Sequence, residues 1–458
     1  MADTIVALAT PPGRSGIGVV RLSGPEAVAF ARRLCSDNKY DPNPRHASLK
    51  VLADLETGDP IDEAVLTYFK GPHSFTGEDV VEISCHGSPV LLRHVIDACL
   101  KLGARLAEAG EFTLRALANG RMDLAEAEAV RDLIDARTAA SARQAVRQMR
   151  GEFSDRLQPI KDNLLDAIVV LESALEFVED DLPEMQTARL RDNLQQIADE
   201  TGEMAATFKA GRLLRVGLKG TFAGRTYVGK SSLFNALLGT ERAIVTEIAG
   251  TTRDQINEGF VVHGIPVLLT DTAGLRETQD TVESIGVERS RRAIADADLV
   301  IVVIDASDVS PDEDAQVLES ISELPHVVAI NKVDKIASVD DTVDRVGRIA
   351  KNGSGEIVPV SAKTGRGLDE LKHAIVHPFI AHEGVDGGFL VTDARHHDLL
   401  ARSRDEILSS LELLDQKASE ELTLIGLHNA LRYLGQITGE TTTEDMLTRI
   451  FSTFCIGK

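Results

Sequence analysis

The fold is decided by the stretch Gly224-Arg-Thr-Tyr-Val-Gly-Lys-Ser231, which matches the pattern GxxxxGK[ST]. It follows a candidate strand, Arg215–Ala223, and opens a candidate helix, Ser231–Leu238, which is the context that this pattern requires. Its glycines let backbone N–H groups close around phosphates, and the helix N-terminus adds positive potential. We expect Lys230 to reach the β- and γ-phosphates and the Ser231 hydroxyl to bind magnesium. A short pattern alone also fits an ordinary glycine-rich turn.

Three later segments decide against an ordinary turn, because each directly follows an apolar run that is typical of a strand. They are Asp271-Thr-Ala-Gly274, Asn331-Lys-Val-Asp334 and Ser361-Ala-Lys363. A carboxylate at Asp334 can accept the N1–H and 2-amino hydrogens of guanine, a pattern that adenine does not offer. The set predicts a GTP site with Gly224, Val228, Gly229, Lys230, Ser231, Ser232, Asp271, Thr272, Ala273, Gly274, Asn331, Lys332, Asp334, Ser361, Ala362 and Lys363 as nucleotide-binding residues.

The residue that activates water is not given by these motifs. Many GTPases place a glutamine directly after the glycine of the second motif. This chain has Leu275 there, which cannot hold water. The next segment offers Glu277, Asp280 and Glu283 as acids, although any of them is equally typical of a solvated surface.

The rest of the chain indicates an α/β part combined with an all-α part. Strand runs alternate with helical runs over 213–380, which predicts a parallel sheet covered by helices. Residues 1–118 indicate a mixed α/β domain, whereas 119–212 and 381–458 are helical. We expect the tail helices to fold back on those before 213, so that the GTPase domain is inserted into one discontinuous helical domain. Ala381–Gly388 is the expected linker.

Composition and charge restrict the class of protein. The chain has 458 residues, with 49 Lys and Arg against 72 Asp and Glu, a net charge of −23. Such a surface repels nucleic acid, so a nucleic-acid partner requires a local basic patch or a helper protein. The four cysteines form no CxxC pair, which favours reduced, cytoplasmic chemistry. Neither a membrane span nor a targeting peptide is indicated.

Further motifs identify a family. Gly250-Thr-Thr-Arg-Asp254 lies between the phosphate loop and Asp271, and the sequence ends in Phe454-Cys-Ile-Gly-Lys458. The N-terminal third adds Ser74-Phe-Thr-Gly-Glu-Asp79, Gly110-Glu-Phe-Thr113, Arg115-Ala116 and Asn119-Gly-Arg-Met-Asp-Leu124. Together these resemble the tRNA uridine-5-carboxymethylaminomethyl modification GTPases, the MnmE (TrmE) family, from about residue 3 to 458.

The resemblance implies three parts. An N-terminal domain forms a homodimer and binds a one-carbon donor, 5-formyl- or methylene-tetrahydrofolate. A helical domain carries the inserted Ras-like GTPase domain and a C-terminal cysteine. A flavin-dependent partner, MnmG or GidA, joins it in a heterotetramer to modify the wobble uridine of certain tRNAs. GTP hydrolysis follows dimerisation of the GTPase domains around potassium.

The resemblance also implies roles for single residues. Thr252 matches the switch threonine on Mg²⁺, and Glu283 matches the glutamate that positions water. Lys230 and Cys455 complete the expected catalytic set. The loop that encloses K⁺ matches Thr246, Ile248 and Thr251, and the folate site matches Arg21, Glu82 and Arg121.

One position departs from the family pattern. Tyr227 stands where the family has an asparagine that supplies an oxygen to potassium. A phenol is a bulkier and poorer ligand than an amide carbonyl, so potassium stimulation is put in question.

Two cysteines admit other interpretations. Cys455 is fourth from the printed end, but Ile-Gly-Lys does not fit a prenylation box, which leaves a tail thiol that is either functional or unreactive. Cys85 lies beside His86, but adjacent strand residues point to opposite faces, so we expect no nucleophile there. The alternative function is a stand-alone regulatory or ribosome-assembly GTPase switch, which needs neither the folate motifs nor Cys455.

Overall fold

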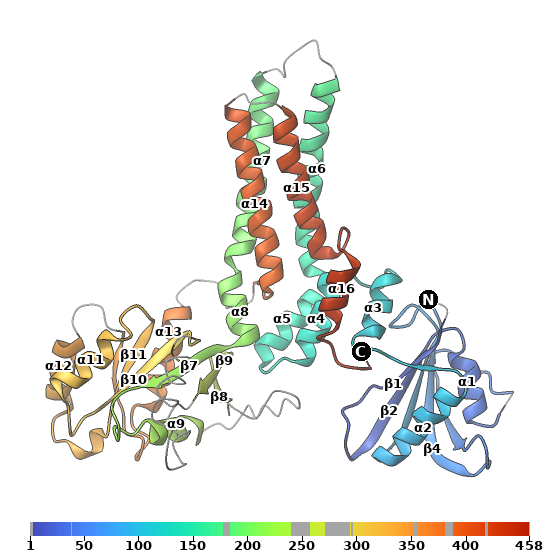
Figure 1. Cartoon of the computed structure of the whole chain (residues 1–458), viewed down its shortest axis with the longest axis horizontal. Helices are drawn as coiled ribbons and strands as arrows, with labels where there is room; N and C mark the ends of the chain where they lie inside the picture. The colour runs from blue at the N-terminus through green and yellow to red at the C-terminus, as the bar shows by residue number, and fades with distance from the viewer. Residues whose placement is uncertain are drawn as a thin grey trace. The chain divides into compact units, whose positions relative to one another are not determined.

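The structure is a computed structural model that describes residues 3–37, 39–176, 184–239, 257–270, 294, 296–350, 355–380, 388–416 and 420–457. The chain forms two compact units (Figure 1). Unit 1 comprises Met1–Ile134, Val146–Gln195 and Asp405–Lys458, and unit 2 comprises Asp135–Ala145 and Gln196–Arg404. The predicted domains, 1–118, 119–212, 213–380 and 381–458, divide the chain differently, and we retain them as a proposal.

Unit 1 contains a six-stranded sheet in the order β3-β4-β5-β2-β1-β6. The only parallel pair in it is β1 with β6. The strands are β1 (Ile5–Leu8), β2 (Ser15–Ser23), β3 (Ala47–Ala53), β4 (Pro60–Phe69), β5 (Val80–Gly87) and β6 (Arg105–Leu106).

The two faces of this sheet differ because successive strand residues point to opposite sides. Helices α1 (Ala27–Leu34) and α2 (Pro89–Lys101) pack on one face, where Val20, Leu66 and Ile83 are fully buried. On the other face, which we call the outer face, Leu49 and Val65 are exposed cross-strand partners. Arg21 and Glu82 lie on this same outer face by register.

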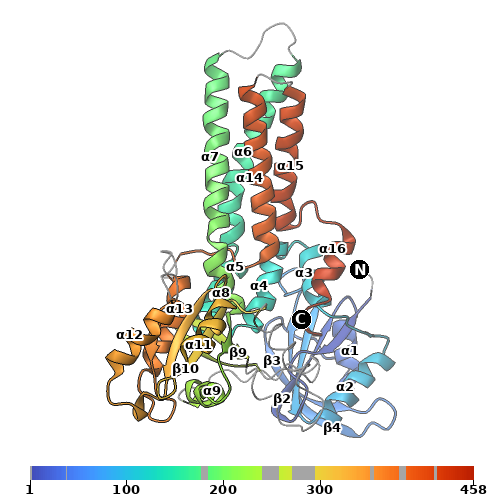
Figure 2. The same ribbon diagram turned by 60° about the vertical axis from the view of Figure 1, so that its left-hand side comes forward.

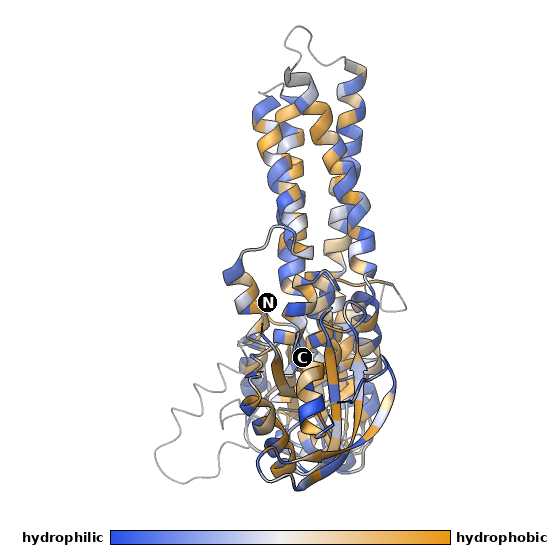
Figure 3. Ribbon diagram, turned by 90° about the vertical axis from the view of Figure 1, so that its right-hand side faces the viewer, coloured by the Kyte–Doolittle hydropathy of each residue, from blue (hydrophilic) through white to orange (hydrophobic). Residues whose placement is uncertain are grey.

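Helices complete unit 1. They are α3 (Glu111–Ala118), α4 (Leu124–Ile134), α6 (Glu152–Glu176), α15 (Glu420–Thr438) and α16 (Glu444–Phe451). Helices α6 and α15 lie side by side (Figure 1, Figure 2), so the tail helices do fold back on the earlier ones, as predicted. Three further helices run from one unit into the other: α5 (Ala139–Met149), α7 (Glu184–Ala206) and α14 (Ala394–Asp415). Figure 3 shows hydrophilic and hydrophobic residues alternating along the long helices, which is the expected amphipathic pattern.

Unit 2 contains a second six-stranded sheet, in the order β12-β11-β10-β7-β9-β8. Only β8 is antiparallel to its neighbour. The strands are β7 (Leu218–Ala223), β8 (Asn257–Val262), β9 (Ile265–Thr270), β10 (Leu299–Asp305), β11 (His326–Asn331) and β12 (Ile357–Pro359). Every residue of β10 is buried, which is typical of a central strand covered on both faces.

The described helices of unit 2 connect and cover this sheet. They are α8 (Phe208–Val216), α9 (Lys230–Gly239), α11 (Pro311–Glu319), α12 (Val339–Ala350), α13 (Leu368–Ile380) and the 3₁₀ turn η2 (Val333–Lys335). The predicted combination of an α+β domain, a helical part and a P-loop α/β part is confirmed.

One expectation from the sequence is corrected here. The predicted strand Arg215–Ala223 begins only at Leu218, because α8 buries Leu213 and Leu214 and continues to Val216. Gly217, with φ +90°, ends that helix. Strands β3 and β4 were not predicted. Residues 381–387 of the expected linker lie outside the described residues.

Candidate functional site

The phosphate-binding motif forms the loop between β7 and α9, as its pattern requires. Gly224 has φ +139°, and a Cβ atom there would lie 2.4 Å from the Val303 carbonyl oxygen. Gly229 has φ +97°, and a Cβ atom there would lie 2.4 Å from Asn331 Nδ2. Both positions therefore require glycine, since any side chain would displace a neighbouring strand or loop.

Lys230, the first residue of α9, lies across this loop. Its Nζ donates hydrogen bonds to the carbonyl oxygens of Gly224 at 2.8 Å and Arg225 at 2.6 Å. These bonds tie the ammonium group to the beginning of the loop. The loop ends at a helix N-terminus, where free backbone N–H groups stabilise an anion. The combined positive potential suits a chain of phosphates.

Asn331, at the end of β11, joins the phosphate loop to a second predicted segment. Its side chain is buried. Nδ2 donates to the Val228 carbonyl oxygen at 3.1 Å, and Oδ1 accepts from the Ala362 backbone N–H at 3.1 Å. One amide therefore brings three segments together that are far apart in the sequence.

Lys332 extends this connection. Its Nζ donates to the Tyr227 carbonyl oxygen at 2.7 Å and to Asp305 Oδ2 at 2.6 Å. Burial alone would raise the pKa of Asp305, but hydrogen bonds from Lys332 and Ser307 outweigh it, so the pKa lies below its usual value. The Asp305 carboxylate thus stays ionised and holds the lysine in place.

Asp334 is placed to contact a base. It lies in η2, just after β11, and is exposed. Its Oδ1 accepts a hydrogen bond from Ser361 Oγ at 2.6 Å, which lowers the pKa of the carboxyl group. The ionised carboxylate accepts hydrogen bonds only, which is the property needed to bind adjacent N–H donors.

Arg225 fixes the beginning of the loop from the other side. Its Nε donates to Asp314 Oδ1 at 2.9 Å, and its Nη1 lies 3.1 Å from Glu313 and 3.3 Å from Asp308. Asp314 is buried in the first turn of α11. Arg225 is thus engaged in a structural ion-pair cluster.

Tyr227 has an unusual backbone conformation. Its φ is +66°, a left-handed conformation that asparagine and glycine adopt readily and bulky residues rarely adopt. Its side chain is 93% exposed. The backbone of this position therefore fits the asparagine that the family pattern has there, and the phenol is exposed to solvent.

The remaining predicted nucleotide residues divide into two groups. Ser231, in the first turn of α9, is half-buried, while Ser232 and Lys363 are exposed. Other predicted residues lie outside the described residues: Thr246, Ile248, Thr251, Thr252, Asp271, Thr272, Ala273, Gly274 and Glu283.

A second cluster lies in unit 1, on the outer face of the sheet. Arg21 of β2 and Glu82 of β5 are cross-strand partners. Arg21 Nε and Nη2 both donate to Glu82 Oε1, at 3.0 and 2.7 Å. No described residue donates to the other oxygen of Glu82, and this side chain is 28% exposed. The pair thus leaves one carboxylate oxygen for a ligand.

Aromatic rings and a loop surround this pair. The ring centres of Phe75 and Phe112 lie 5.9 and 5.7 Å from the Arg21 guanidinium carbon. Phe75 belongs to the loop 74–79, and Arg121 Nε donates to the Ser74 carbonyl oxygen of this loop at 3.2 Å. The loop therefore connects the three predicted folate-site residues.

The C-terminal tail reaches the same place. The Gly110 backbone N–H donates to the Cys455 carbonyl oxygen at 3.3 Å, and Ile456 forms an antiparallel bridge with Ala109. Arg21 Nη1 donates to the Gly457 carbonyl oxygen at 3.3 Å. Cys455 itself is a free, exposed cysteine. The structure thus brings the predicted residue Cys455 within two residues of an Arg21 contact.

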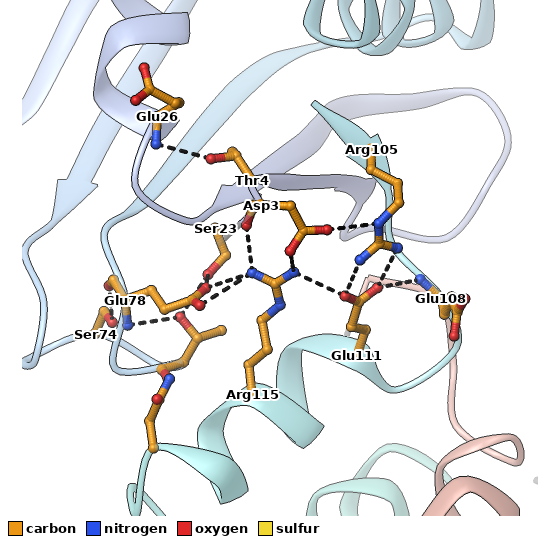
Figure 4. Close-up of polar contacts among 12 residues, drawn as sticks. Asp3, Thr4, Ser23, Glu26, Ser74, Glu78, Arg105, Glu108, Glu111 and Arg115 are labelled. Carbon is orange, nitrogen blue, oxygen red and sulfur yellow. Dashed lines mark hydrogen bonds and ion pairs between the residues drawn. The ribbon is translucent and has the colours of Figure 1, made fainter. Parts of the chain in front are cut away.

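A buried ion-pair network supports this cluster (Figure 4). Arg115 is 1% exposed and contacts Asp3, Glu78 and Glu111 at 2.8 to 3.0 Å. Burial would lower the pKa of Arg115 and raise that of Glu111, but in each case the hydrogen-bonded partners outweigh burial and keep the group charged. Arg115, itself in α3, thereby joins the segment just before β1 to the loop 74–79.

Several of these functional neighbours escaped sequence reasoning. Glu78 and Arg115 lie inside quoted motifs, but no spacing rule indicates that they pair. Asp305 and Asp314 belong to no motif, and only their position at the end of a buried strand and at a helix start gave a signal.

None of the helices in the described part of the chain is long and apolar enough to cross a membrane.

Comparisons with known proteins agree with this geometry. The sequence model of the MnmE helical domain matches residues 124–455, and that of the GTP-binding protein TrmE N-terminus matches residues 4–121. Two relatives, each named tRNA modification GTPase MnmE, come from Koribacter versatilis and Aquifex aeolicus. Both are 44% identical to this chain and cover 100% of it, over 99% and 100% of their own lengths.

Solved structures also match part of the chain. The G domain of the T. maritima iron transporter FeoB is 31% identical, with a TM-score of 0.27. The match covers 35% of this chain and 97% of that domain.

Proposed function

The chain belongs to the MnmE family of tRNA modification GTPases, and from this premise we propose that it adds a carboxymethylaminomethyl group to C5 of the wobble uridine in certain tRNAs. GTP hydrolysis and a role in tRNA modification are those of the family. The one-carbon donor, the flavin-dependent partner and the residue roles below belong to the proposal. A site of action in the cytoplasm is consistent with four free cysteines.

The phosphate loop and the segments that follow β9, β11 and β12 supply GTP binding and hydrolysis. Lys230 and the α9 N-terminus stabilise the phosphates, and Asp334 binds the guanine edge. Ser231 offers a hydroxyl oxygen in the first turn of α9, the kind of ligand that Mg²⁺ accepts, and Thr252 would supply another. When bound, Mg²⁺ neutralises charge on the phosphates.

Glu283 is the proposed residue that positions the attacking water. Glu283→Ala is expected to lower hydrolysis by about 10²-fold, the usual range for loss of a general base. GTP affinity, measured by titration with a fluorescent nucleotide, should stay within a few-fold. If Glu277→Ala or Asp280→Ala lowers hydrolysis by a similar factor and Glu283→Ala does not, the residue that positions water is Glu277 or Asp280 instead.

Potassium is the least supported cofactor. Thr246, Ile248 and Thr251 would enclose the ion. Tyr227 is 93% exposed, so its phenol is a poor fit for a cation ligand. We propose that potassium stimulates this protein only modestly.

The outer-face cluster fits a reduced folate. A pterin ring is flat and carries adjacent N–H donors, and its glutamyl tail carries carboxylates. The free oxygen of Glu82 suits the donors, the Phe75 and Phe112 rings suit the flat ring, and Arg21 and Arg121 suit the carboxylates. When bound, the folate supplies the one-carbon unit.

The C-terminal segment that contains Cys455 supports the proposed role in tRNA modification. The segment that carries Cys455 is bound by its backbone to Gly110 and, at Gly457, to Arg21, which supports a role of the thiol in modification and not in GTP hydrolysis. With a net charge of −23, the chain needs a helper to hold tRNA, a task that we assign to the flavin-dependent partner in a heterotetramer.

The outer face also supports a homodimer. Ile17, Leu49 and Val51 are 63%, 66% and 47% exposed there, and Val65 adjoins Leu49. Exposed apolar side chains of this kind mark association surfaces. Leu49→Glu should convert a dimer to a monomer in sedimentation equilibrium, and a dimer that persists would place the interface elsewhere.

Nucleoside analysis tests the proposed function as a whole. Cells lacking this chain should lose the modified wobble uridine and regain it on complementation. A stand-alone GTPase switch, the alternative, predicts unchanged wobble uridines and no binding of reduced folate by the purified protein.

A further inference from the structure

The segment between α16 and Cys455 is held by packing and not by secondary structure. After α16 ends at Phe451, the chain turns through Ser452 and Thr453 to Phe454. Phe451 and Phe454 are both buried, and their ring centres are 4.9 Å apart. They pack against Leu124 and Ala127 of α4, so the tail begins from a fixed point on that helix.

Gly110 shows how closely this anchor fits the start of α3. With φ +68°, it offers a bare backbone on which a Cβ atom would lie 2.9 Å from Phe454 Cβ. The next residue of the tail, Cys455, receives the Gly110 N–H at its carbonyl oxygen. The position of the Cys455 backbone therefore depends directly on the position of Phe454.

One charged side chain holds both residues that precede Cys455. Arg131, in the last turn of α4, donates from Nη1 to Thr453 Oγ1 at 2.9 Å. Its guanidinium carbon also lies 5.5 Å from the Phe454 ring centre, a cation–π distance. The side chain is 19% exposed, and Asp132 lies 3.5 Å away and balances its charge. Such a planar cation is well suited to stack and donate at once.

We propose that Arg131 is a positioning residue for Cys455, which clamps Thr453 and Phe454 so that the Cys455 segment stays docked on Gly110 and, through Gly457, on Arg21. This inference rests on the proposed function of Cys455 in tRNA modification. The described contacts of Arg131, with Thr453, Phe454 and Asp132, all lie in unit 1, whereas the phosphate loop belongs to unit 2. Its loss therefore affects modification and leaves GTP hydrolysis unchanged.

Alkylation of Cys455 measures the clamp directly. Iodoacetamide reacts with thiolates, and burial raises the pKa of Cys85 and Cys99 to about 12 and that of Cys35 to about 11, so Cys455 is the accessible thiol. In the full-length protein, Arg131→Ala should change the Cys455 alkylation rate by about threefold or more, because a held segment becomes free to open. Modification of tRNA in the complete system should fall about tenfold from the misplacement.

Matched variants separate the clamp from a general structural effect. Arg131→Lys keeps the charge, so it should restore part of the normal alkylation rate and part of the tRNA modification activity, the latter mainly in kcat. Thr453→Val removes the exposed hydroxyl that accepts from Arg131 and donates to the Ile450 carbonyl oxygen at 2.7 Å, so it tests the clamp even if Arg131→Ala does not fold. Arg449→Ala removes an exposed arginine from α16 and should change neither rate.

The outcomes are distinct. Unchanged alkylation in Arg131→Ala and Thr453→Val overturns the proposal, as does altered alkylation with full modification, or reduced modification with unaltered alkylation. If Cys455→Ser retains full modification, the proposed function of the thiol fails instead, while the alkylation result still reports on the clamp.

Discussion

The nucleotide loops and the Arg21 cluster are built in opposite ways. The nucleotide loops come from short motifs, each at the end of a strand of one sheet, and are joined by Asn331 and Lys332. The Arg21 cluster combines β2, β5, the loop 74–79, α3 and the last residues of the tail. The first region is therefore marked by local motifs, although the contacts that join them span 103 and 105 residues. The second region is marked by no such set of motifs and includes a contact between Arg21 and Gly457 that spans 436 residues. We expect the second region to be more sensitive to substitutions far from its ligand.

Arg115→Met should have the largest effect, and it should be confined to the second region. It removes the buried cation between Glu78 and Glu111; Glu111 keeps its ion pair with Arg105 at 2.6 Å, whereas Glu78 loses its charged partner in the described part of the chain. Breaking a buried ion pair costs up to about 3–5 kcal/mol. Hydrogen exchange in the full-length protein should speed up in β1, α3 and the loop 74–79, with no change in the nucleotide loops. Arg93→Met, which removes an exposed arginine from α2, is the control. Unchanged protection would mean that the network is dispensable.

Cys455→Ser should separate the two regions by activity. The modified nucleoside is expected to fall by about 10²-fold or more if the thiol takes part in the chemistry. The GTP hydrolysis rate should stay within about twofold, because the described contacts of the Cys455 segment, with Ala109, Gly110 and Arg21, lie in unit 1. Cys35→Ser is a matched control at a half-buried thiol. Wild-type modification by Cys455→Ser would make the tail a structural element only.

Asp334→Asn should weaken the nucleotide region by a smaller amount. The amide loses one acceptor for the guanine N–H groups, so GTP affinity should fall about tenfold or more, which is at least about 1.4 kcal/mol. The variant should also bind xanthosine triphosphate, whose additional carbonyl accepts a hydrogen bond from the amide. Competition titrations measure both, with the exposed α12 residue in Asp340→Asn as control. Equal GTP affinity in variant and parent would remove Asp334 from the base site.

Tyr227→Asn should give the smallest change and test whether the nucleotide loops are complete. In the parent, exchanging sodium for potassium at equal ionic strength should alter hydrolysis by less than about tenfold, well below what a full charge at the phosphate supplies. Asparagine also tolerates the left-handed backbone better than tyrosine, so Tyr227→Asn should raise potassium stimulation without loss of stability. Tyr227→Phe should behave as the parent does. Strong potassium stimulation of the parent that Tyr227→Asn leaves unaltered would show that this position does not control the ion.

The same contrast explains what could be predicted from the sequence. The phosphate loop, Asn331 and Asp334 were found because each motif directly follows a strand that buries both faces, such as β10 and β11. Strands β3 and β4 escaped prediction because their outer-face residues are exposed and combine Leu49 and Val65 with the charged Glu63. The roles of Arg115 and Arg131 follow only from tertiary contacts, which no local pattern encodes. Even Tyr227 was recognised as a departure from the family, but its left-handed backbone became evident only in the structure.

The two-sided hydrogen bonding of Asn331 has a consequence for how the nucleotide leaves. Because its amide holds the Val228 carbonyl on one side and the Ala362 N–H on the other, the base-side turn and the phosphate-side loop open together or not at all. Displacement of the 361–363 turn would therefore loosen the grip on the phosphates without any contact to them. A partner that displaces this turn would therefore change the rate at which GDP dissociates. The rate of turnover would then be controlled from outside the phosphate loop.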